Sequence, residues 1–172
     1  SMALTKLNFS GQPTLPSANM PTGSVLQVIH SEMDGADSAT AVGSLTSYTD
    51  TGLSVSITPS STSSKILVFV STNIGASHSS STTAARYDLR LVNNDASATA
   101  YESRYVGTDY QGSGNLSVHD TFHGYFSPSS TSSQTYKVQT RVAGGSTDQA
   151  TSLYLKWYGG AKHTITAMEI VG

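Results

Sequence analysis

One segment constrains the fold of this chain more than any other, because it is apolar on both faces. Residues 66–70 read ILVFV, and the strand-like segments 25–29 and 165–171 are nearly as apolar. Other segments, such as 52–58 (GLSVSIT), alternate between apolar and polar residues, which is typical of strands with one solvent-facing side. A strand that is apolar on both sides lies in a sheet centre or faces another subunit. The pattern predicts a β protein with one sheet face covered from outside a single sandwich.

Clusters of Ser, Thr, Gly and Pro separate the predicted strands, and no segment of ten or more residues has helical periodicity. The chain holds 30 Ser and 22 Thr but only 12% charged residues, so its surface is hydroxylated rather than charged. Its net charge of −2 and nine Tyr argue against disorder. We therefore predict an all-β fold, a jelly-roll β-sandwich of about 8–10 antiparallel strands.

Two nearly identical strings follow predicted strands. Residues 58–64 read TPSSTSS, and residues 127–133 read SPSSTSS. Proline fixes the backbone at the entry to a turn, and Ser and Thr side chains bond to nearby backbone groups. The repetition predicts that one turn is used twice in a two-sheet fold.

The N-terminal residues 1–24 are predicted to form an extended arm, with the jelly-roll domain at 25–172. Pro13, Pro16 and Pro21 exclude a regular helix from the arm. Ser1 is interpreted as a cloning scar before a native start at Met2. The sequence contains no apolar stretch of the length that a transmembrane helix needs and no signal-peptide pattern. We expect no membrane insertion.

Several kinds of chemistry find no support in the residues. Cysteine is absent, no basic patch suits nucleic acid, and no nucleophile or phosphate-loop pattern occurs. His119 and His123 lie about 13 Å apart on a strand, too far to share a metal ion. Three copies of one His could still meet on a threefold axis as a metal or pH-sensitive site. We expect no enzyme, no cofactor and no metal.

Three strings carry a resemblance to a known family. They are PSANMPTGSVLQVIHS (16–31), YTDTGLSVSITPSSTSSKILVFVST (48–72) and TITAMEIVG (164–172). They resemble the jelly-roll domains of tail-fibre and virion structural proteins from marine phages, cyanophages included. The resemblance implies a trimer similar to tumour necrosis factor, at or near the end of a virion appendage, without catalytic residues. The region 75–126 matches no pattern of that family.

Trimerisation through one sheet would cover the strands that are apolar on both faces. The residues predicted to lie in the trimer interface are Val25, Phe69 and Ile170, one from each doubly apolar segment. The alternative is a monomer whose own loops cover that face.

The candidate receptor-binding residues are Arg104, Asp109 and Tyr110. An aromatic ring with hydrogen-bonding neighbours suits a sugar or a protein receptor, because it gives contact area at little cost in entropy. The loops expected to take part are 75–85, 93–98 and 107–115.

These observations predict a non-enzymatic phage virion structural protein, assembled in the host cytoplasm. We expect a trimeric fibre-tip or appendage domain that binds a host-surface glycan or protein and attaches to other virion proteins through its arm. The alternative is a capsid decoration or head-fibre protein without receptor binding, and a more remote one is an enzyme that acts on polysaccharide.

Overall fold

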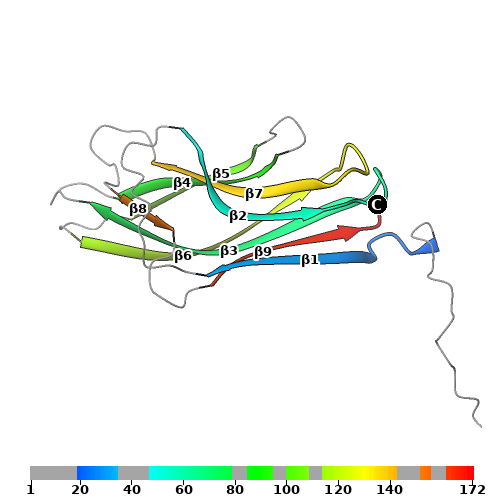
Figure 1. Cartoon of the computed structure of the whole chain (residues 1–172), viewed down its shortest axis with the longest axis horizontal. Coiled ribbons are helices and arrows are strands. Elements are labelled where there is room, and N and C mark those ends of the chain that lie inside the picture. The colour runs from blue at the N-terminus through cyan, green and yellow to red at the C-terminus, as the bar shows by residue number, and fades with distance from the viewer. Residues whose placement is uncertain are drawn as a thin grey trace, which may run out of the picture.

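The computed structural model describes residues 19–34, 47–78, 85–94, 100–108, 114–142, 152–155 and 162–172. These residues form nine strands in two layers (Figure 1). The strands are β1 (Val25–Asp34), β2 (Thr49–Ile57), β3 (Lys65–His78), β4 (Ala85–Asn93), β5 (Ala100–Thr108), β6 (Gly114–Phe126), β7 (Gln134–Val142), β8 (Ser152–Leu155) and β9 (Lys162–Ile170). The predicted all-β, two-sheet antiparallel sandwich is confirmed.

The first sheet has the order β1-β9-β3-β6, with β8 beside β3, and the second sheet has the order β2-β7-β4-β5. Antiparallel pairs are nested along the chain: β1 pairs with β9, β2 with β7, β3 with β6, and β4 with β5. The chain is therefore arranged like one long hairpin that has been rolled up. Pairing of β3 with β9 and of β4 with β7 completes the two sheets, which is jelly-roll topology.

The core lies between the two sheets and is built from every second residue of each strand. Period two places these side chains on the inner faces, as the alternation of 52–58 predicts. The rings of Phe126 and Tyr136 bridge the layers with centroids 4.7 Å apart. The buried apolar side chains are Leu53, Val55, Ile57, Ile66, Val68, Val70, Leu89, Leu91, Phe122, Phe126, Tyr136, Val138, Ile165 and Ala167.

Gly124 on β6 leaves room for two core side chains. A Cβ atom at this position would lie 2.6 Å from the Phe126 ring and 2.7 Å from a Leu91 methyl group. Both distances are too short, so the core must shift to accept any side chain. We expect Gly124→Ala to lower the free energy of unfolding by about 1–3 kcal/mol, measured by urea denaturation. Thr121→Ala, on the exposed side of β6, is the control and should cost less than about 1 kcal/mol; equal stability of Gly124→Ala and the wild type would contradict the close contact.

The repeated serine strings share one local hydrogen bond, although only the first has a backbone-bonded turn, in which the N–H of Ser64 donates to the carbonyl of Ser61 over 3.3 Å. The backbone N–H of Ser63 donates to Oγ of Ser61 over 3.1 Å, and that of Ser132 donates to Oγ of Ser130 over 3.2 Å. These serines occupy equivalent positions of the two strings. One turn joins β2 to β3 and the other joins β6 to β7, so each passes between the sheets, as predicted.

The sandwich has two different ends. At one, here called the arm end, β1 begins, β9 ends and both serine turns lie; it is on the right of Figure 1. At the other, the loop end, β1, β3, β5 and β7 end. The predicted grouping of the three binding loops needs correction, because β4 ends at the arm end. The 93–98 connection is therefore opposite to the other two.

The segment before β1 is tied to the end of β9. The backbone N–H of Gly23 donates to the carbonyl of Val171, and the N–H of Val171 donates to the carbonyl of Ser24, both over 2.9 Å. Gly23 has φ of 89°, which favours glycine at this turn. Residues 1–18 of the predicted arm lie outside the described residues.

Candidate functional site

The outer face of the first sheet changes in character from one end to the other. Strand pairing aligns its outward side chains in rows across β1, β9, β3 and β6. The two rows nearest the arm end are Val25, Ile170 and Lys65, and then Val28, Met168, Leu67 and Tyr125. The middle row is His30, Thr166, Phe69 and His123. Toward the loop end follow Glu32, Thr164, Ser71 and Thr121, and last the pairs Asp34 with Lys162 and Asn73 with His119. Apart from Lys65, the side chains of the first two rows from the arm end are apolar, and the ion pairs of Lys162 with Glu32 and Asp34 lie toward the loop end.

The apolar half of this face is open to solvent in the single chain. We use this name for Val25, Val28, Leu67, Phe69, Tyr125, Met168 and Ile170. Val28 is 52% exposed, Tyr125 50% and Phe69 40%. Single exposed apolar residues are common, but a contiguous apolar patch marks an interaction surface. The three residues predicted for a trimer interface, Val25, Phe69 and Ile170, all lie on this patch.

The loop-end half of the same face is polar and internally paired. The Lys162 ammonium lies 2.6 Å from Oδ1 of Asp34 and 2.9 Å from Oε1 of Glu32. The hydrogen bonds to Asp34 and then to Glu32 raise the pKa of Lys162. These ion pairs are exposed and satisfied within one chain, so this half does not need a partner.

His30 and His123 lie in one row across the sheet, at the border of the apolar half; we call it the histidine row. Nδ1 of His30 lies 2.8 Å from the hydroxyl of Thr166, and the His123 ring is tilted against Phe69 with centroids 6.0 Å apart. His119 is on the same face beyond this row, with Nε2 3.1 Å from the hydroxyl of Ser71. The sequence reasoning missed this arrangement, because only the pairing of β1 with β9 and of β3 with β6 brings these residues to one face.

The outer face of the second sheet has its own polar network. The guanidinium groups of Arg90 and Arg141 lie 3.9 and 4.5 Å from the centre of the Tyr48 ring. Nζ of Lys137 donates to Oδ2 of Asp50 over 2.7 Å. This hydrogen bond lowers the pKa of Asp50, against the opposing effect of burial. Like the loop-end half of the first sheet, this face presents charged groups that have partners within the chain.

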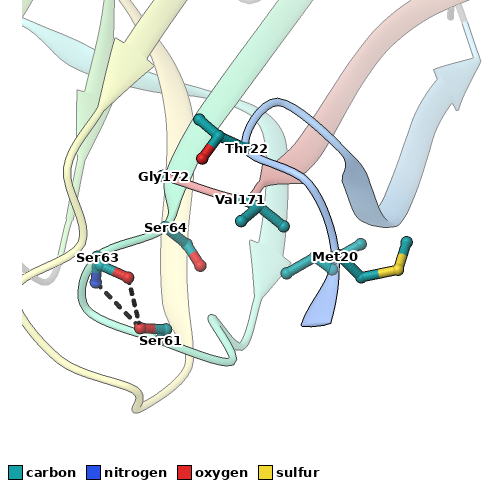
Figure 2. A pocket seen from close by; sticks show the side chains of 8 residues that line it. Met20, Thr22, Ser61, Ser63, Ser64, Val171 and Gly172 are labelled. Atoms are coloured by element: carbon teal, nitrogen blue, oxygen red, sulfur yellow. Dashed lines mark hydrogen bonds between the residues drawn. The ribbon is translucent and has the colours of Figure 1, made fainter. Parts of the chain in front are cut away.

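A pocket of about 270 Å³ lies at the arm end, between the N-terminal segment and the turn at 58–64 (Figure 2). It is lined by Met20, Thr22, Leu26, Ser61, Ser63, Ser64, Val171 and Gly172. The hydroxyls of Ser61 and Ser63 lie 2.9 Å apart and bond to each other. The side chains that line it are apolar or carry hydroxyl groups.

The candidate receptor-binding residues are only partly within the described chain. Arg104 lies on β5 opposite Leu89. Asp109 and Tyr110 lie outside the described residues, in the connection that leaves β5 at the loop end. Whether the three side chains meet stays a prediction.

The described residues contain neither a metal-binding cluster nor a membrane-spanning helix. In these ranges, no three His, Asp or Glu side chains come close enough to hold a metal ion. The described segments also contain no helix that is long and apolar enough to cross a membrane.

Comparison with known proteins does not identify a family for this chain. No protein-family profile matches the sequence, and no curated protein is significantly similar to it. Among solved structures, the chain is similar to one described as the structure of infectious bursal disease virus Gx strain, with 12% identity and a TM-score of 0.39. That alignment covers 85% of this chain and 33% of the other, so this chain spans about a third of that protein's length. A likeness this distant carries no functional argument.

Proposed function

We propose that this chain is a non-enzymatic structural module of a virus particle, whose copies form a homotrimer through the apolar half. The observation that carries the proposal is the exposure of Val25, Val28, Phe69 and Tyr125 on one face of the first sheet. Val25 is 49% exposed and Val28 52%, on the edge strand of the sheet. Covering such side chains removes apolar surface from water, which is the main driving force of protein association.

Another copy of the same chain is the partner that suits the patch best. Its side chains are mainly aliphatic and offer few hydrogen-bonding groups, as in the apolar centre of homo-oligomer interfaces. In a closed ring of three copies, each contact joins two different surfaces of neighbouring copies, and the same face of every copy turns toward the threefold axis. The number of three copies follows from the resemblance to trimeric appendage domains.

The two ends of the sandwich give the trimer a direction. The apolar half lies at the arm end, where the N-terminal segment reaches β1. The arm would therefore attach to the particle, and the loop end would face outward. The β5–β6 connection, with Asp109 and Tyr110, belongs to that outward end. We propose that it contacts a host-surface glycan or protein, with weak contacts from three copies acting together.

Light scattering of the full chain tests the assembly. A trimer has a mass of about 54 kDa, three times the 18.0 kDa of one chain. A mass of 18 kDa at tens of micromolar would overturn the trimer proposal.

Binding of fluorescently labelled protein to host cells and to empty capsids tests the role. Binding to cells that is weakened at least tenfold by Tyr110→Ala supports receptor contact. Binding to capsids alone would instead identify a decoration protein, and release of sugar from surface polysaccharide would identify an enzyme. The matched control is Ser129→Ala, an exposed residue in the second serine turn at the arm end.

A further inference from the structure

We propose that the trimer contact is acid-sensitive, because His30 and His123 lie inside it and their protonation separates the copies. The inference rests on the proposed function, and it concerns how that same surface is regulated. Acid sensitivity depends on the extent of the apolar half, on the groups around the two imidazoles and on the number of imidazoles in a trimer.

The apolar half is not confined to the first two rows from the arm end. Its Phe69 lies in the next row, paired with His123 on β6 and with Thr166 on β9. A contact that covers the whole apolar half therefore extends into that row.

The next row contains Phe69 between His30 and His123. Phe69 is 40% exposed and contacts the His123 ring, so a partner that covers Phe69 also covers this imidazole. His30 lies on the other side, with Thr166 between it and Phe69. In this row, Thr166 and the ring of Phe69 therefore lie between two imidazoles, His30 on β1 and His123 on β6.

No acid in this row compensates a charged imidazole. Imidazole side chains gain a proton between about pH 5 and 8, and burial disfavours the charged form. Glu32, the nearest carboxylate to His30 along β1, is ion-paired with Lys162. The other titratable or charged side chains on this face are Lys65 on β3, Tyr125 and His119 on β6, Asp34 on β1 and Lys162 on β9.

The threefold repeat makes the response steep. Each trimer holds two such histidines in each of three copies, and every imidazole that takes up a proton when the copies separate adds to the pH dependence of the assembly equilibrium. Lowering the pH therefore acts on all contacts together. We expect the chain concentration at half-assembly to rise at least a hundredfold between pH 7.5 and pH 5.5.

The test is the mass of the full chain at pH 7.5 and pH 5.5 by sedimentation equilibrium, with circular dichroism to confirm the fold. We expect about 54 kDa, three times 18.0 kDa, at pH 7.5 and single chains at pH 5.5. The double variant His30→Gln, His123→Gln should stay trimeric at both values. His119→Gln, on the same face but beyond the histidine row, is the matched control and should dissociate like the wild type.

The outcomes separate the two proposals. Single chains at both pH values would overturn the trimer itself. A wild type that stays trimeric at pH 5.5, or a double variant that dissociates like the wild type, would overturn acid sensitivity while leaving the trimer intact. Loss of the folded spectrum of the wild type at pH 5.5 would assign the dissociation to unfolding and also overturn the inference.

Discussion

Phe69→Asp is expected to convert an assembly of about 54 kDa, three times 18.0 kDa, into single chains. Phe69 is 40% exposed, so its replacement removes little from the core of one chain. In the assembled state, however, the carboxylate would be buried among the apolar side chains of the contact, at a cost of about 3–5 kcal/mol per copy. Light scattering at equal chain concentrations measures the mass, and circular dichroism confirms the fold.

Two further variants locate the contact. Val28→Asp introduces the same charge from another strand of the apolar half and should also give single chains. Ser56→Asp places it on the outer face of the second sheet, where Ser56 is exposed, and should leave the mass unchanged. Dissociation by Ser56→Asp, or a trimer that tolerates both other substitutions, would show that the contact lies elsewhere.

The parts of the fold that depend on local patterns could be predicted from the sequence. The alternation of apolar and polar residues along a strand identifies its buried side, and it correctly assigns Ile57 to the core. The same rule shows that 66–70 has apolar residues on both faces, and the structure leaves Phe69 on the open one. The serine turns were predictable because each depends on side chains within seven residues.

Features that depend on register could not be predicted in this way. The histidine row requires β1 to pair with β9, and His30 and Thr166 are 136 residues apart in the sequence. The place of the 93–98 connection also follows from strand order rather than from local sequence. Of the candidate receptor site, only the backbone position of Arg104 is described, so that site stays a prediction.

Glu169 is the polar residue that sequence reasoning would least expect in the core. It lies on the inner side of β9 and is fully buried, although the string TITAMEIVG gives no sign of a polar partner. Nε2 of Gln27 donates to its Oε2 over 2.6 Å, and the backbone N–H and hydroxyl of Ser60 donate to its Oε1 over 2.7 Å each. The carboxylate therefore holds the first serine turn and β1 against the end of β9.

Glu169→Gln is expected to lower the free energy of unfolding at pH 7 by about 2–4 kcal/mol, because a neutral amide oxygen accepts more weakly from Ser60 and the amide NH2 group cannot accept from Gln27. Burial alone would raise the pKa of Glu169, but hydrogen bonds from Gln27, Ser64 and Ser60 outweigh it and lower the pKa below 4.5. A lowered carboxyl pKa stabilises the fold above that ordinary value, and this stability is lost as the pH falls through the folded-state pKa.

Urea denaturation of the wild type and Glu169→Gln at several pH values from 7 to 3 measures this effect. The difference between them should be largest near pH 7 and shrink below pH 4.5, as the wild-type carboxylate takes up its proton. Glu32→Gln is the control, because that side chain is 53% exposed and an exposed ion pair contributes at most about 1 kcal/mol. A difference that stays constant down to pH 3 would mean that the charge of Glu169 does not hold the serine turn, and that packing of its side chain alone accounts for the loss.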